Sequence, residues 1–205
     1  DKSILNINKS HFVNNSANYY GGVINSWYST SVLNNSELIN NSAYTGGIVY
    51  SGNNIDTTIL NSLLDNNYAN KTANYVYSST DNLTINNCVI LNENNESSIY
   101  CYNSKYVLYE NWWGINNPSF ALLTNNILPN NWRILIAENH ENNLTKEINV
   151  SLNHLSNSET ISKDLINRTV YFTTTSANLE FESSNITTSI NNRYYGNLED
   201  TFVRV

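Results

Sequence analysis

Carboxylate side chains are the first candidates for chemistry in this chain, because paired acids cleave polysaccharides and clustered acids hold calcium. The acids to consider are Asp56, Asp65, Asp81, Glu93 and Glu96. Each occupies a different place in the internal repeat described below, so no acid is stacked on another. The sequence therefore predicts no catalytic, metal-binding or cofactor-binding residue, although loops could still bring two acids together.

The histidines and lysines do not define a site either. His11, His140 and His154 lie far apart without the spacing of metal ligands, so we expect exposed strand or loop residues. Lys146 or Lys163 could form an isopeptide cross-link with an Asn or Asp, as in some surface Ig-like domains. Such a bond needs a buried lysine beside an acid.

Two cysteines, Cys88 and Cys101, raise the question of a disulfide. In the repeat, Cys88 falls in the column of Ser10, Ser36 and Ser62, and Cys101 falls in a column of other serines. A cysteine packs well in an interior as a small residue. We therefore expect two buried free thiols, and a disulfide is the alternative.

The composition favours short strands separated by many corners. Of 205 residues, 43 are Asn and 15 are Tyr, and charged residues make up only 13%. Asn, Ser, Thr and Gly favour turns, whereas Ile, Val, Tyr and Thr favour strands. The net charge of −7 disfavours nucleic acid as a partner, because phosphate binding needs clustered Lys and Arg.

No apolar run approaches the length of a membrane span, so we expect no membrane insertion by this fragment. The chain starts and stops within patterns, and we expect it to be a piece of a longer protein. Matches to the Asn-x-Ser/Thr glycosylation signal are little more frequent than chance gives in so Asn-rich a chain, which leaves glycosylation open. They begin at Asn8, Asn14, Asn34, Asn40, Asn70, Asn82, Asn95, Asn143, Asn149, Asn167 and Asn185.

An internal repeat organises the N-terminal part. The phrase "NNSANYYGGVINS" returns as "NNSAYTGGIVYS", and several columns recur every 26 residues through four copies. One column holds Phe12, Leu38, Leu64 and Ile90, and another holds Asn14, Asn40, Asn66 and Asn92. A second group of columns drifts by a few residues and contains Ile24-Asn25-Ser26, Val49-Tyr50-Ser51, Val76-Tyr77-Ser78 and Ile99-Tyr100-Cys101.

The repeat predicts a parallel β-helix in which each copy forms one coil of three short strands, about 4.8 Å from the next coil. A leucine-rich repeat is the alternative, but its Leu pattern and helical stretch are missing. The Phe12 column would stack as an apolar ridge. The Asn14 column would form a ladder at a corner, where Asn tolerates left-handed backbone angles, or alternatively a ligand-binding row. The pairs Gly21-Gly22 and Gly46-Gly47 predict a tight corner.

These motifs carry a resemblance. "FVNN" followed by "GGVI", and "LINN" followed by "GGIV", resemble the repeats of chlamydial polymorphic membrane proteins and, more closely, of adhesin-like surface proteins of methanogenic archaea. The resemblance implies right-handed β-helix repeats that end in an "NWWG" segment before Ig-like repeats, and "NWWGINNP" begins here at Asn111. Coils three and four depart from the pattern, with Ala73-Asn74 and Ser97-Ser98 in place of Gly-Gly.

The NWWG segment is predicted to close the open end of the β-helix. Trp112 and Trp113 would cover the apolar cross-section, and Pro118 would withhold a backbone donor from a further coil. An aromatic sugar-binding platform is the alternative for this segment. Elsewhere, Trp27 and Tyr28 lie at a corner and are the candidate glycan contacts.

Residues 129–205 lack the 26-residue repeat, and apolar and polar residues alternate there instead. The alternating apolar residues are Trp132, Ile134, Ile136, Ile148, Val150, Leu152, Val170, Phe172, Leu179, Phe181, Val203 and Val205. This pattern predicts an antiparallel β-sandwich, which the resemblance makes Ig-like. The closing strand "TFVRV" ends where complete Ig-like repeats have about two more strands, which leaves open an incomplete sandwich. The β-helix with its cap is expected over residues 1–128.

Repeated structure without a catalytic constellation, together with the resemblance, predicts a non-enzymatic function. We expect an extracellular, cell-surface adhesin or surface scaffold that contacts glycans or proteins of another cell, without a cofactor. A carbohydrate-binding module is the first alternative. A polysaccharide lyase or hydrolase is the second, because some β-helix proteins are such enzymes.

Overall fold

The structure, a computed structural model, describes residues 2–53, 55–91, 97–125, 127–141, 146–166, 168–169, 171–174, 179–180, 185–186, 189–194 and 201–204. It divides into two units, Asp1–Trp132 and Arg133–Val205. The first unit extends past the expected limit at residue 128, because Asn130 donates its backbone N–H to the carbonyl of Leu108 at 2.9 Å and Trp132 bridges Asn111.

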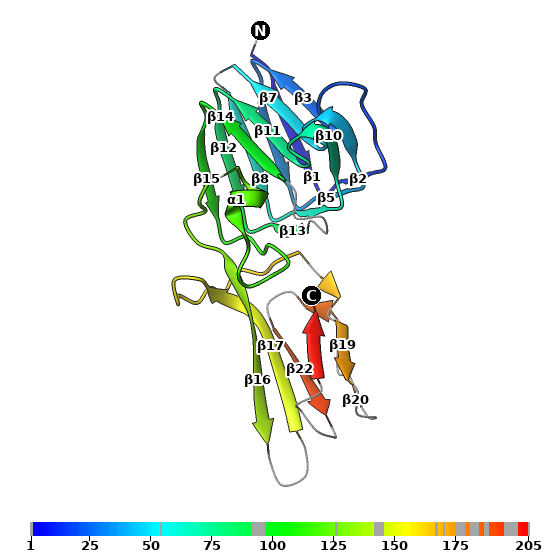
Figure 1. The fold of residues 1–205 in the computed structure, drawn as a ribbon, viewed down its shortest axis with the longest axis vertical. Helices are drawn as coiled ribbons and strands as arrows, with labels where there is room; N and C mark the ends of the chain where they lie inside the picture. The colour runs from blue at the N-terminus through cyan, green and yellow to red at the C-terminus, as the bar shows by residue number, and fades with distance from the viewer. Residues whose placement is uncertain are drawn as a thin grey trace. The chain divides into compact units, whose positions relative to one another are not determined.

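The first unit is a parallel β-solenoid of about four turns (Figure 1). Its first sheet contains β1 (Ile4–Asn8), β4 (Thr30–Asn34), β8 (Asp56–Leu60), β12 (Asn82–Asn86) and β15 (Lys105–Tyr109). The second sheet contains β2 (His11–Val13), β5 (Glu37–Ile39), β9 (Leu63–Asp65) and β13 (Val89–Leu91). The third contains β6 (Ser42–Thr45) and β10 (Tyr68–Thr72), and the fourth contains β3 (Ile24–Trp27), β7 (Val49–Gly52), β11 (Val76–Ser79) and β14 (Ile99–Tyr102).

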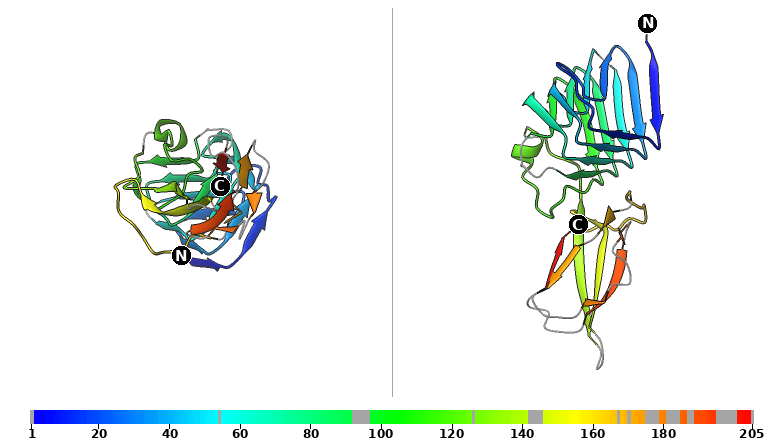
Figure 2. Two further views of the ribbon diagram at one scale, coloured as in Figure 1. Left: turned by 90° about the horizontal axis from the view of Figure 1, so that it is seen from below. Right: turned by 90° about the vertical axis from the view of Figure 1, so that its right-hand side faces the viewer.

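The predicted parallel solenoid with a repeat of about 26 residues is confirmed. Strands of successive coils lie side by side, as the right-hand view of Figure 2 shows. The expectation of three strands per coil is wrong for the two middle coils. Each of these coils has four strands, β4–β7 in one and β8–β11 in the next. The extra strands, β6 and β10, arise because the chain turns sharply after Ile39 and Asp65 and then runs straight again for a few residues.

The apolar column lies in register across the second sheet. Phe12 pairs with Leu38, Leu38 with Leu64, and Leu64 with Ile90. The last three are fully buried in the core, whereas Phe12 in the first coil is half-buried. The same side-chain position therefore differs in burial according to how many coils flank it.

Asparagines stabilise the corner that follows this sheet. Asn14, Asn40 and Asn66 have φ of 59°, 55° and 50°, and Asn66 donates its side-chain amide to Asn40 Oδ1 at 2.7 Å. These left-handed angles cost less for Asn than for most residues. Asn92 lies outside the described residues.

A second row of asparagines, one residue further on, was not predicted. Asn41 and Asn67 are buried, and Asn67 Oδ1 accepts hydrogen bonds from both the backbone N–H and the side-chain amide of Asn41. Asn67 in turn donates to the carbonyl of Leu38 at 2.8 Å. Asn15 donates to Asn41 Oδ1 in the same way at the exposed first coil. The row satisfies backbone groups that the corner would otherwise leave buried and unpaired.

Aromatic residues close the C-terminal end of the solenoid core. Trp113 is 4% exposed and packs edge-on against Phe120, at 5.4 Å between ring centroids. Phe120 opens the single-turn helix α1 (Phe120–Leu123), whose Leu123 joins the same core. Trp112 is also buried, but it bridges Val89 and lies outside this core cluster. Both expected cap residues are therefore buried, and Trp113 belongs to the core cluster.

The second unit is antiparallel, with β17 (Lys146–Leu155) between β16 (Arg133–Glu141) and β22 (Ser189–Tyr194). β20 (Leu179–Glu180) pairs with β22. The remaining pairs are β18 (Arg168–Thr169) with β21 (Asn185–Ile186) and β19 (Tyr171–Thr174) with β23 (Thr201–Arg204). Among the predicted apolar positions, Val170, Phe181 and Val205 lie outside the described residues. No helix in the described parts of the chain is long and apolar enough to cross a membrane.

The sequence predicts that Ile134 and Ile136 face the core at the start of β16, and this prediction is wrong. Ile134 and Ile136 are only half-buried, whereas Arg133 between Trp132 and Ile134 is fully buried. The Arg133 guanidinium donates to the carbonyls of Leu152 and Lys163, at 2.6 Å each, which compensates its burial. The register of β16 against β17 also shifts between Ile134 and Ile136.

Candidate ligand-binding groove

Tight corners join the third sheet to the fourth, and residues on either side of these corners line a groove. Gly46 has φ of 67°, and a Cβ on Gly47 would lie 2.2 Å from the carbonyl oxygen of Asn74 in the next coil. In the first coil, Gly21 likewise has a positive φ, and a Cβ on Gly22 would lie 2.3 Å from the carbonyl oxygen of Gly47. In the third coil Ala73 takes the left-handed angle, with φ of 62°. The glycine pairs therefore allow the chain to turn sharply, while successive coils remain in backbone contact.

One wall of the groove is a ladder of tyrosines on the fourth sheet. Tyr50, Tyr77 and Tyr100 pair in register on β7, β11 and β14. Ring centroids are 4.9 Å apart for Tyr50 and Tyr77 and 5.4 Å for Tyr77 and Tyr100, and the planes are within 7° of parallel. In the first coil Asn25 holds this position, and Tyr20 from the preceding corner places its ring 4.4 Å from Tyr50.

The ladder rings overlap only partly. Touching carbons lie about 3.5–4.0 Å apart, so parallel rings with centroids 4.9 Å apart are slipped sideways by about 3 Å. Tyr50, Tyr77 and Tyr100 are all half-buried. Each ring therefore leaves part of its face and edge open to the groove.

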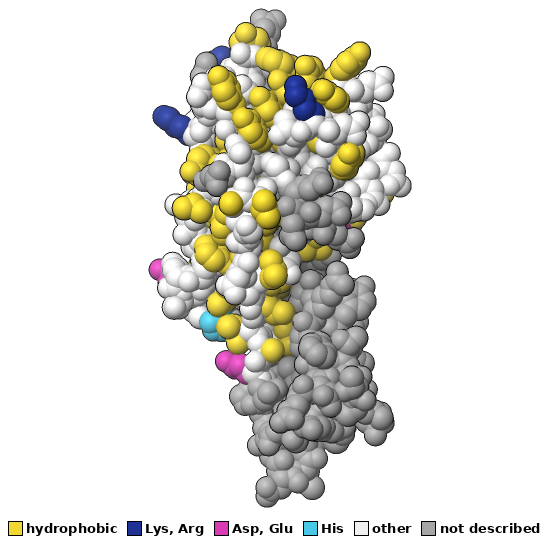
Figure 3. Space-filling view, in the orientation of Figure 1, with side chains coloured by type: hydrophobic (Ala, Val, Ile, Leu, Met, Phe, Trp, Pro, Cys, Tyr) yellow, Lys and Arg dark blue, Asp and Glu magenta, His cyan; other side chains and the backbone are white. Residues whose placement is uncertain are grey.

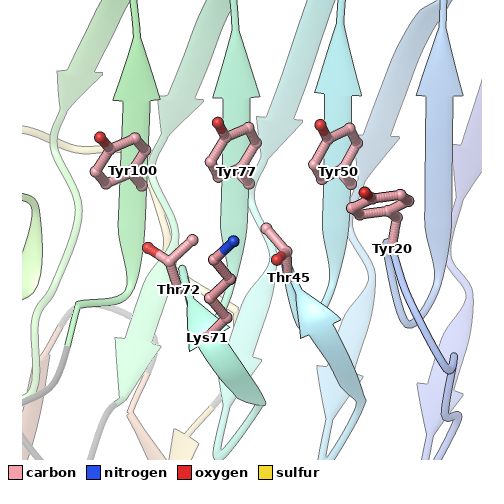
Figure 4. A pocket seen from close by; sticks show the side chains of 7 residues that line it. All are labelled: Tyr20, Thr45, Tyr50, Lys71, Thr72, Tyr77 and Tyr100. Carbon is pink, nitrogen blue, oxygen red and sulfur yellow. The ribbon is translucent and has the colours of Figure 1, made fainter.

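The opposite wall comes from the ends of β6 and β10. Thr45 and Thr72 contribute hydroxyl groups, and Lys71 contributes an amine whose Nζ lies 5.7 Å from the ring centroid of Tyr44. The groove has a volume of about 400 Å³. Figure 4 shows the tyrosines in a row on neighbouring strands with Thr45, Lys71 and Thr72 facing them. The space-filling view shows hydrophobic side chains scattered among polar ones over the solenoid (Figure 3).

The pKa values of two phenols in the ladder, Tyr50 and Tyr77, are raised. Burial raises the pKa of Tyr50 above its usual value, and the neighbouring Tyr77 and Tyr20 raise it further. Burial and Tyr100 raise the pKa of Tyr77 in the same way. At neutral pH Tyr50 and Tyr77 therefore present hydroxyl groups that can both donate and accept hydrogen bonds.

Of the two sequence-predicted aromatic contacts, Trp27 lies beside this groove. Trp27 is 46% exposed and packs against Tyr50 at 5.4 Å between centroids, but it is not among the residues that line the groove. Tyr28 is 59% exposed with φ of 57°, just after β3 ends. The ladder itself was missed, although Tyr50, Tyr77 and Tyr100 occupy one column of the sequence repeat. A column of one aromatic type on the outward side of a strand was the available signal.

The cysteines are both free, and they differ in burial. Cys88 is buried as expected, whereas Cys101, which was also expected to be buried, is only half-buried. Cys101 pairs with Ser78 in the expected column. Burial, with a contribution from Asp81, raises the pKa of Cys101 to about 12. A thiol of that pKa is a poor nucleophile at neutral pH.

The other residues considered for chemistry are dispersed. His11 is exposed and its Nδ1 lies 2.9 Å from Glu37 Oε2. Asp56 accepts a hydrogen bond from the Asn82 amide at 2.8 Å, and Asp81 is buried. Within the described residues no three His, Cys, Asp or Glu side chains gather as a metal site. Glu93 and Glu96 lie outside the described residues.

An isopeptide cross-link needs a buried lysine, and of the two lysines considered for it Lys163 is exposed. Lys146 lies in β17, but its side chain is outside what the structure describes. His154 is half-buried in β17, with Nδ1 3.4 Å from Ser151 Oγ, and the side chain of His140 is outside what is described.

Comparisons with family models, with curated proteins and with solved structures found no match. The fold of this chain is therefore assigned from its own strand pairing and sequence repeat. The repeat, the parallel pairing and the stacked columns identify the N-terminal unit as a β-solenoid of about four turns.

Proposed function

We propose that this chain is a non-catalytic adhesin or surface-scaffold module that acts outside the cell, at a cell surface. The observation that carries the proposal is the tyrosine ladder, which presents equivalent side chains on consecutive coils along one groove. A rigid repeat with a continuous binding face suits attachment through many small contacts. The resemblance to adhesin-like surface proteins of methanogenic archaea supports the same function.

The proposal includes the finer architecture. The solenoid is right-handed, as parallel crossover connections almost always are. Residues 129–205 form an Ig-like sandwich that displays or spaces the solenoid. The partners are glycans or proteins on another cell, rather than nucleic acid or membrane lipid.

A carbohydrate-binding module is the second candidate, and the groove favours it specifically. Phenol rings with threonine hydroxyls are the side chains that pack on sugar rings and bond to their hydroxyl groups. A polysaccharide-cleaving enzyme is the third candidate. The groove lining, which consists of tyrosines, threonines and one lysine, supports binding better than acid–base hydrolysis.

A cell-binding assay, a glycan array and an assay for released reducing ends, all with the intact chain, test these candidates together. The expected result is retention on a defined class of cells or glycans without sugar release. Release with turnover that is abolished by Asp56→Asn or Asp65→Asn would establish an enzyme instead. Failure to bind any cell or glycan would overturn the adhesive function.

A further inference from the structure

We propose that the groove binds a linear, neutral polysaccharide chain that runs parallel to the solenoid axis, with about one sugar residue per coil. This inference rests on the proposed adhesive function and specifies the ligand. The ligand class follows from the spacing, the chemistry and the backbone pairing of the groove walls.

The spacing sets the shape of the ligand. Successive tyrosine ring centroids, from Tyr20 through Tyr50 and Tyr77 to Tyr100, are 4.4, 4.9 and 5.4 Å apart. These steps match the strand spacing of a sheet, about 4.8 Å. They are also close to the length of one pyranose ring in an extended chain with equatorial linkages. A straight chain can therefore place about one sugar against each coil, whereas a strongly curved or branched glycan would lose register after one or two coils.

The walls offer the two contacts that a sugar needs. The slipped faces of Tyr50 and Tyr77 provide apolar surface for the C–H groups of a pyranose ring. The hydroxyls of Thr45 and Thr72 provide donors and acceptors on the opposite side. Both walls repeat from coil to coil, because the residues occupy equivalent positions on β6 and β10 and on β7 and β11.

The charge distribution favours a neutral chain. Lys71 is the sole charged residue in the described lining, and its amine lies near the face of Tyr44. A cation over an aromatic ring is already partly compensated. The whole chain carries a net charge of −7, which repels a polyanion. Lys71 is therefore assigned as a donor to sugar hydroxyls.

A peptide strand fits this surface poorly. β7 is hydrogen-bonded to β3 on one side and β11 on the other, and β11 is bonded to β7 and β14. A peptide that adds to a sheet needs an unpaired edge. Along the tyrosine ladder the ligand must bind through side chains, which suits a glycan.

The test is a titration of the intact chain with cello-oligosaccharides and manno-oligosaccharides from disaccharide to hexasaccharide. Affinity is expected to rise with each sugar up to about four residues, the number of rings in the ladder, and then to level off. Tyr77→Ala should lower affinity by about 2- to 12-fold, the effect of one aromatic contact. Tyr77→Phe keeps the ring and should lower it less. Tyr106→Ala, on β15 in the first sheet and outside the groove lining, is the matched control and should leave affinity unchanged.

Each alternative outcome has a distinct meaning. Binding that is independent of oligosaccharide length, or equal in the wild type and Tyr77→Ala, would overturn the groove as the site while leaving adhesion itself intact. Tighter binding of oligogalacturonates that is lost in salt and in Lys71→Gln would overturn the neutral ligand. Circular dichroism checks the fold of each variant. If Tyr77→Ala does not fold, Tyr20→Ala at the exposed end of the ladder replaces it and should also weaken binding, and unchanged affinity would count against the proposal.

Discussion

The first coil and the middle coils of the solenoid have the same sequence pattern but differ in burial. Leu64 is 0% exposed because Leu38 and Ile90 pair with its strand position on either side. Phe12, the larger residue, is only half-buried because Leu38 is its one partner in the described column. In a solenoid, burial is therefore a property of the neighbouring coils as much as of the residue itself.

The two ends of the solenoid extend the comparison. At the C-terminal end, Trp113 and Phe120 are buried over the last coil. At the N-terminal end, Ile4, Leu5 and Val13 are exposed, and Ile4 is 73% exposed. One end is thus covered by aromatic side chains, while the other presents apolar groups to solvent.

The largest effect is expected at the covered end. Trp113→Ala should lower the free energy of unfolding by about 3–5 kcal/mol, because it removes a buried aromatic ring and leaves a cavity beside Phe120. Ile4→Ala should change it by less than about 0.5 kcal/mol. Urea denaturation followed by circular dichroism measures both. Similar losses at the two ends would contradict the described difference.

Next in size is the apolar column. Leu64→Ala should cost about 2–5 kcal/mol, because the cavity would lie between two packed coils. Phe12→Ala should cost less despite the larger side chain, because the ring is already half in water. The same denaturation experiment compares them. Negligible losses at both positions would be incompatible with a stacked core.

A smaller effect is expected for the buried asparagine row. Asn67→Ala should cost about 1–3 kcal/mol, because the Asn41 backbone N–H and the Leu38 carbonyl would lose their partner. Asn15→Ala, at the exposed first coil, should cost about 0.5 kcal/mol, because water replaces the lost bonds. Thermal and urea melts of the two variants test the contrast. If Asn15→Ala proved as costly as Asn67→Ala, the row would not depend on burial.

The smallest effect concerns alkaline pH. The pKa values of Tyr50 and Tyr77 are raised in the folded chain, so the folded state holds these protons more tightly than the unfolded state. Their contribution to stability is complete below the unfolded pKa of about 10 and is lost as the pH rises through the folded pKa. Unfolding free energies measured across this range should fall with pH. The unfolding free energy of Tyr77→Phe should fall less steeply with pH, because that variant lacks one of the two phenols. An identical slope in the variant and the wild type would exclude this linkage.

Much of the fold followed from particular residues of the sequence. The columns of Phe12 and of Ser10 keep one spacing through four copies, and only stacked parallel coils place such columns in line. The Gly46-Gly47 pair and the positive φ of Asn40 and Asn66 fit the predicted corners. Other features depended on packing that no single column reveals. Trp113 packs against Phe120, and the buried Arg133 guanidinium donates to the carbonyls of Leu152 and Lys163.

The sequence alone determined the period, the parallel stacking and the places of the corners, because these depend on local turn chemistry and on repetition. The tertiary structure alone decided the groove. Tyr20 joins Tyr50 from a different place in its coil, and Thr45 and Lys71 line the groove with the ladder because the corners at Gly46-Gly47 and Ala73-Asn74 turn the chain from the third sheet into the fourth. Those contacts join outward faces of different strands, and the order of residues along the chain does not specify how closely two such faces approach.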